Sequence, residues 1–152
     1  EAEAELERVR AAARDPMLKD TKLEFNKSGP ILEIAAEVLA AHIAAARGDM
    51  NRAIAHLSDA ARLEDDLVYG EPPDWTIPVR QELGHALLAA GRPIEAERAF
   101  REDLERFPDN AWSLFGLAEA LRAQSRGEEA DRIAAQFRRV WQGTTAKPFL
   151  AF

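Results

Sequence analysis

The sequence contains no cysteine, which excludes a thiolate-ligated zinc site and leaves the redox compartment undetermined. It also lacks an excess of basic residues, since 27 acidic and 20 basic side chains give a formal net charge of −7. Binding to a nucleic-acid backbone needs a concentrated basic surface, so we predict no nucleic-acid partner. No apolar run is long enough to cross a bilayer, and we expect no membrane partner.

The motifs of common catalytic sites are missing as well. The chain has no HExxH sequence, no glycine-rich phosphate loop and no cysteine nucleophile. Ser113 and Ser125 do not stand in the context of a nucleophile elbow, and we expect His56 to be structural. We therefore predict that the protein is not an enzyme and needs no cofactor.

The composition is that of packed amphipathic helices. Apolar residues make up 47% of the 152 residues and charged residues 31%, which does not suit a disordered chain. Residues 1–14 form a strong helical pattern that Pro16 ends, and residues 17–29 are predicted to be a loop with a helical turn at 21–26. The chain begins with Glu1 and not Met, so we expect a mature protein or an excised fragment.

A repeated helical hairpin follows the loop. The pattern predicts helices on both sides of Gly48, with Pro30 in the first turn of one and Asp49 capping the other. The central stretch carries Leu83, Gly84, Leu87, Gly91, Ala96, Phe100 and Pro108. Thr76 is the expected N-cap of the first central helix, and Gly91 its C-terminal cap. Ala130 follows Ala96 by 34 residues, which places a third hairpin in the same phase.

The central spacing resembles that of the tetratricopeptide repeat (TPR), a 34-residue helical hairpin. The resemblance covers about residues 31–142, and the chain looks like the C-terminal region of longer bacterial multi-repeat proteins. It implies an all-α fold, a right-handed TPR-type superhelical solenoid of stacked helical hairpins. The expected domains are an orphan helix plus loop at 1–29, three hairpins at 30–142 with an insertion at 65–75, and a tail at 143–152.

In the TPR family the first helix of each repeat lines a concave groove, and the resemblance carries this role onto specific residues. The groove residues are His42, Gln81, His85, Trp112, Phe115, Glu119 and Arg122. The implied function is a protein–protein interaction scaffold that binds a peptide or a partner helix. His42, His85 and Glu119 share one repeat position, so a zinc site is an alternative to three unrelated polar residues. We favour the latter and predict no metal.

Two aromatic regions leave alternatives open. Tyr69, Pro72, Pro73 and Trp75 form either an exposed insertion platform or a plug between hairpins, and we favour the plug. Trp112 and Phe115 either form a binding patch or pack against the insertion or the tail.

The tail residues Phe149, Leu150 and Phe152 suggest a further alternative. The tail could fold into its own groove or enter that of a neighbour, which would give self-association within a longer chain. The identity of the partner, the compartment and the oligomeric state are not determined by the sequence.

Overall fold

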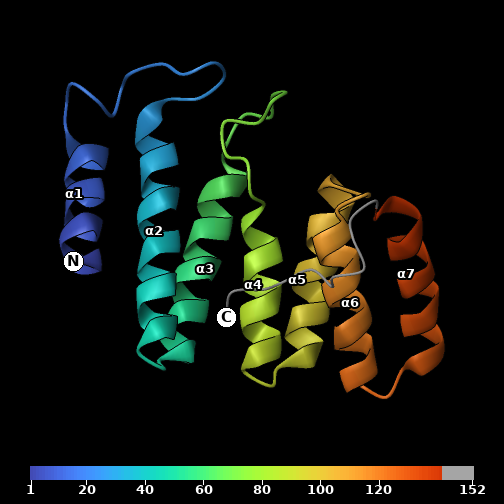
Figure 1. Cartoon of the computed structure of the whole chain (residues 1–152). Helices are drawn as coiled ribbons and strands as arrows, with labels where there is room; N and C mark the ends of the chain where they lie inside the picture. The colour runs from blue at the N-terminus through green and yellow to red at the C-terminus, as the bar shows by residue number, and fades with distance from the viewer. Residues whose placement is uncertain (142–152) are drawn as a thin grey trace. The chain divides into compact units, whose positions relative to one another are not determined.

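The computed structural model describes residues 1–141, and these contain seven α-helices and no strand longer than an isolated bridge (Figure 1). The helices are α1 Ala2–Arg14, α2 Ser28–Ala46, α3 Met50–Asp65, α4 Val79–Ala89, α5 Pro93–Arg106, α6 Ala111–Ala123 and α7 Gly127–Val140. The predicted all-α hairpin architecture is confirmed. Two compact units divide the chain, unit 1 at Glu1–Val79 and unit 2 at Arg80–Phe152, and each is described by itself.

Unit 1 packs α2 between α1 and α3 (Figure 1). Its core is made largely of alanine, which lets helix backbones approach closely. The fully buried members are Ile34, Ala41, Ala53, Leu57, Ala60 and Val79. Gly48 turns the chain between α2 and α3 with φ +79°, a conformation that glycine adopts without strain. Asp49 then caps α3 by accepting a hydrogen bond from the Arg52 amide at 3.0 Å, as predicted.

Helix α2 is the most apolar helix in the described part of the chain, and it corrects one expectation. By length and composition alone, Ser28–Ala46 is long and apolar enough to cross a membrane, although no such segment was expected from the sequence. A core helix has the same composition, and α2 does pack against α1 on one side and α3 on the other.

The structure also corrects two local predictions in unit 1. Residues 21–26 form no helical turn; Lys22 and Lys27 instead pair as an antiparallel bridge. Thr76 does not cap α4, which begins at Val79. The Val79 amide donates to Oε2 of Glu64 at 3.1 Å, so a buried carboxylate from α3 takes the place of the expected cap. A carboxylate at a helix N-terminus is favoured by the helix dipole.

Unit 2 is organised around Phe100 on α5, which is fully buried. A Cβ atom added at Gly84 would lie 2.5 Å from the ring, and one added at Gly116 would lie 2.2 Å from it. Helices α4, α5 and α6 therefore meet at this ring, and both glycines are required by close approach. Gly91 turns the chain from α4 to α5 with φ +70°. The glycine and phenylalanine positions of the central motif thus have direct packing roles.

Candidate functional site

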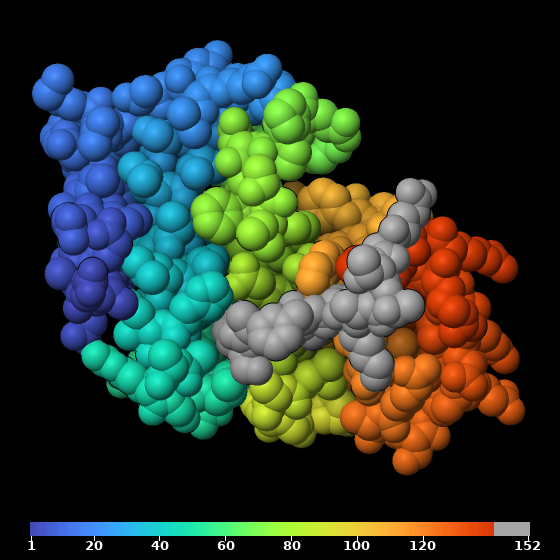
Figure 2. All heavy atoms as spheres, in the orientation of Figure 1, coloured from blue at the N-terminus to red at the C-terminus, as the bar shows by residue number. Residues whose placement is uncertain are grey.

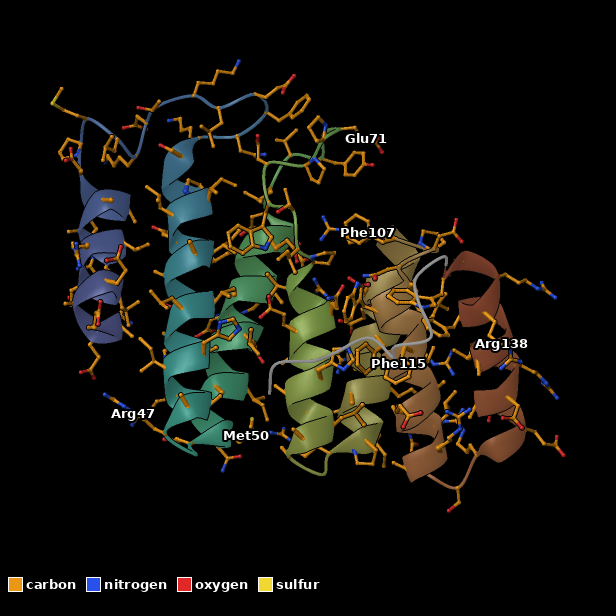
Figure 3. The ribbon with its side chains drawn as sticks, viewed as in Figure 1. Arg47, Met50, Glu71, Phe107, Phe115 and Arg138 are labelled. Carbon is orange, nitrogen blue, oxygen red and sulfur yellow. The ribbon has the colours of Figure 1, made fainter. Side chains whose placement is uncertain are left out.

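One face of α6 carries four of the predicted groove residues. Trp112, Phe115, Glu119 and Arg122 follow one another at intervals of three, four and three residues, which places them on one side of a helix. All four are half-buried or exposed, whereas Leu114, Leu117 and Leu121 are buried. Figure 3 labels Phe115 on this helix. Helix α6 therefore presents a mixed aromatic and charged stripe.

The aromatic half of the stripe packs against α7 and the residue that follows it. The Trp112 and Trp141 rings lie 6.0 Å apart edge to face, and Phe115 lies 5.7 Å from Phe137. Phe137 in turn stacks on Trp141 at 5.6 Å. The described contacts of Trp112 and Phe115 are thus made with this end of unit 2, a partner that was not considered from the sequence. The packing alternative that invokes the tail concerns residues outside the described part of the chain.

The charged half of the stripe is a small ion-pair network. Arg122 contacts Glu119 at 2.6 Å and Asp131 of α7 at 3.5 Å. The side chains of Arg122 and Glu119 are 44% and 42% exposed, so their charges face solvent. Such exposed pairs contribute little to stability, because water screens them. The Arg122 guanidinium therefore lies between two acidic side chains and remains partly accessible to solvent.

Helix α4 contributes His85, but this side chain is buried. It is 4% exposed, lies 4.7 Å from the Phe100 ring, and neither of its nitrogens has a hydrogen-bond partner. Burial lowers the pKa of His85 to about 3, against a weaker opposing effect of the Trp112 backbone. The imidazole is therefore neutral near pH 7 and belongs to the core. Gly116 supplies the space for it, since a Cβ there would lie 2.7 Å from its Cε1 atom.

A buried polar network fixes the start of α6. Asn110 caps the helix by accepting from the Trp112 amide at 3.1 Å. Its side-chain amide donates to Gln81 of α4 at 3.1 Å and to Asp103 of α5 at 2.8 Å. The Ser113 hydroxyl also donates to Asp103, at 2.6 Å. Burial raises the pKa of Asp103, and the hydrogen bonds from Ser113 and Asn110 oppose that change.

This network was not predicted from the sequence. Asp103 lies among charged residues in the sequence, yet it is 1% exposed. Asn110, two residues after Pro108, is an N-cap signal that could have identified the start of α6.

A second network fixes the turn between α6 and α7. Glu97 accepts from Gln124 at 2.8 Å, from Arg126 at 2.5 Å and from Arg101 at 2.9 Å. Arg126 also forms a bidentate pair with Glu129, both contacts at 2.7 Å. Burial raises the pKa of Glu97, but the hydrogen bonds and charges of its partners outweigh it and leave that pKa lowered. Both ends of α6 are therefore tied to the rest of unit 2.

The remaining predicted groove residue, His42, is exposed on unit 1. It lines a cleft of about 360 Å³ beside Leu39, Ile43 and Ala46 of α2 and the first residues of α1. Within residues 1–141 no group of three His, Cys, Asp or Glu side chains is placed to hold a metal ion. The zinc alternative therefore has no supporting geometry in the described residues.

The two aromatic residues of the insertion, Tyr69 and Trp75, differ in their exposure to solvent. Tyr69 is 61% exposed, and its hydroxyl donates to Glu71, which lies at the outer end of this loop in Figure 3. Trp75 is half-buried, and its Nε1 atom is enclosed without a hydrogen-bond partner. Pro72 is exposed and Pro73 half-buried. Tyr69 thus faces outward and Trp75 inward.

Comparisons with known proteins agree with this architecture. Residues 87–139 match the model of a tetratricopeptide repeat family. A solved structure of a mutant of MamA superposes with a TM-score of 0.58 at 17% identity, covering 94% of this chain and 99% of that one. No curated protein matches the sequence. Residues 87–139 therefore resemble a tetratricopeptide repeat, a family of protein–protein interaction modules that are generally non-enzymatic scaffolds, and the fold of the chain is similar to that of MamA.

Proposed function

We propose that unit 2 binds a peptide or helix of a partner protein along the exposed face of α6. The observation that carries the proposal is the stripe of Trp112, Phe115, Glu119 and Arg122 on one side of a helix that is tied at both ends. Half-buried aromatic rings are efficient anchors for a partner, and an exposed Arg next to a Glu can select its charges.

Binding at this surface is passive in the proposal. The Asn110 network holds the start of α6, and the Glu97 network holds its end, so the side chains of the stripe are placed before the partner arrives. A surface that is ordered in advance loses less conformational entropy on binding. Gln81 of α4 accepts a hydrogen bond from Asn110 and so helps to hold the start of α6. His85 is buried against Phe100 and next to Gly116 of α6. No catalytic step is part of the proposal.

A peptide-display selection against the whole chain would test this. We expect the selected peptides to shift the amide NMR signals of α6 and to bind at least about tenfold more weakly to Phe115→Ser and to Arg122→Glu. Arg98→Glu is the matched control, because Arg98 is exposed on α5 and pairs only with Glu102 among the contacts described. Equal losses in the control and in the two stripe variants would contradict the proposal.

A further inference from the structure

The exposed large apolar side chains of unit 1 all lie in two loops. Within the described residues, seven large hydrophobic side chains are exposed, and six of them lie in the loops at 15–27 and 66–78. These six are Met17, Leu18, Leu23, Val68, Tyr69 and Ile77, which we call the loop platform. The seventh, Ile94, stands apart on α5. Isolated exposed apolar residues are ordinary, so these side chains indicate an interaction surface only where the two loops lie together.

Hydrogen bonds join the two loops side by side, as Figure 2 also shows (blue and green spheres). The Asn26 side chain donates to the Val68 carbonyl at 2.9 Å and accepts from the Val68 amide at 2.7 Å. Asp74 accepts from the backbone and the side-chain amide of Asn26, both at 2.9 Å. These bonds lower the pKa of Asp74, the side chain of Asn26 having the largest effect. Phe25 fills the space beside Gly70, where a Cβ would lie 2.0 Å from its ring.

The joined loops therefore form an ordered surface and not two independent segments. An apolar patch that is held in shape does not have to lose conformational freedom when a partner binds. Exposing it to water is unfavourable, and its side chains are free to contact a ligand. The region where the loops meet is therefore ordered before any partner binds.

Charge indicates what such a surface would accept. Residues 65–77 contain Asp65, Asp66, Glu71 and Asp74 and no basic residue, whereas residues 15–27 contain three acids and three lysines. Glu71 is exposed beside Tyr69, whose ring face could also receive a cation. An acidic edge on an apolar surface repels an anionic membrane and attracts basic groups.

We propose that the loop platform docks a protein segment in which Arg or Lys alternates with aliphatic or aromatic residues. The apolar side chains would cover Val68 and Tyr69, and the basic side chains would meet Glu71 and the acids around it. This site uses unit 1 alone and is independent of the proposed α6 surface, so either one can fail without the other.

Short synthetic peptides test the proposal directly. In one set Arg alternates with Leu, Ile or Phe, and in a matching set Glu replaces each Arg. Fluorescence anisotropy with the whole chain is expected to show at least about tenfold tighter binding of the Arg set. The double variant Val68→Ser/Tyr69→Ser and the charge reversal Glu71→Lys should each weaken that binding by about tenfold or more. Ile94→Ser, which removes an exposed apolar side chain elsewhere, should leave it unchanged.

Asn26→Ala gives a second measurement that removes no contacting side chain. We expect weaker binding of the Arg set because the loops are no longer joined, with an NMR spectrum that is unchanged in α1–α3. Equal binding of the two peptide sets, or an equal loss in Ile94→Ser, would overturn the proposal. It would also be overturned if the protein without peptide formed oligomers that Tyr69→Ser abolishes, because the occupant would then be a second copy.

Discussion

Unit 1 and unit 2 are built from the same type of helical hairpin but fill their cores differently. Unit 1 uses alanine at most contact positions, so α2 and α3 approach closely around Leu57. Unit 2 uses one large ring, Phe100, which fits against two glycines and a buried histidine. Unit 2 therefore depends on a few specific shapes, whereas unit 1 distributes its packing over many small residues.

Polar groups show the same contrast. In unit 2 the polar residues His85, Asp103 and Ser113 are buried inside the helical layer. In unit 1 Glu64 is buried as well, but Asn26 and Asp74 form a polar cluster that joins loops outside the helices. The comparison predicts that changes of side-chain shape and acid destabilise unit 2, and that the loop contacts of unit 1 contribute less to its stability than its helix core does.

The largest expected effect is that of Phe100→Ala, which should lower the free energy of unfolding of unit 2 by about 3–5 kcal/mol. The ring is fully buried and contacts three helices, so the cavity cannot close easily. Leu57→Ala is the counterpart in unit 1, and we expect a smaller loss of about 2–3 kcal/mol because fewer atoms are removed. Urea titrations followed by NMR would measure each unit separately. A larger loss for Leu57→Ala would contradict the contrast.

Gly116→Ala tests the shape requirement with a single added methyl group. The new Cβ would lie 2.2 Å from the Phe100 ring, so we expect a loss of about 1–3 kcal/mol from overpacking. Phe100→Leu in the same chain should recover part of the loss, because it removes the ring atoms that clash. A double-mutant cycle measures this coupling. Additive losses would mean that the two positions are independent and that the ring does not set the requirement for glycine.

These packing roles explain how much of the fold could be predicted. The central hairpin could be predicted from the sequence because Gly84, Gly91 and Phe100 are each dictated by one local contact or turn. The first hairpin gave a weak signal, since alanine fits many helix contacts and identifies none of them. Helix starts that depend on distant residues were not predictable: Glu64 binds the first residue of α4 across 15 positions.

The candidate site was predicted less completely, for a related reason. Helical spacing alone places Trp112, Phe115, Glu119 and Arg122 on one face. Whether a polar residue on such a face is exposed depends on its neighbours, and His85 is buried because Gly116 leaves room for its ring. The loop platform could not be predicted either, because the pairing of Asn26 with Val68 joins residues 42 positions apart.

Acid should destabilise unit 2 through His85. Its pKa is lowered from 6.5 to about 3 by burial, so between these values the unfolded chain binds a proton that the folded chain does not. Stability is therefore complete above pH 6.5 and decreases as the pH falls, by about 2 kcal/mol between pH 6.5 and 5. His85→Leu should lack this part of the pH dependence, while both proteins share the effects of their carboxylates. Parallel profiles for the two proteins would show that the imidazole is protonated in the fold.

The smallest expected effect is that of a loop variant of unit 1. It tests whether the hydrogen bonds between the two loops also stabilise the helices. Asn26→Ala should lower the free energy of unfolding of unit 1 by only about 1 kcal/mol, because water can replace hydrogen bonds at half-exposed loops. The pKa of Asp74 should rise toward its ordinary value, since the Asn26 side chain has the largest lowering effect, and an NMR titration would detect this. A normal pKa with nearly unchanged stability would show that these bonds serve the shape of the loops and not the helices beneath them. If Asn26→Ala instead unfolded α1–α3, the loops would be part of the core of unit 1, and its tolerance to change would be no greater than that of unit 2.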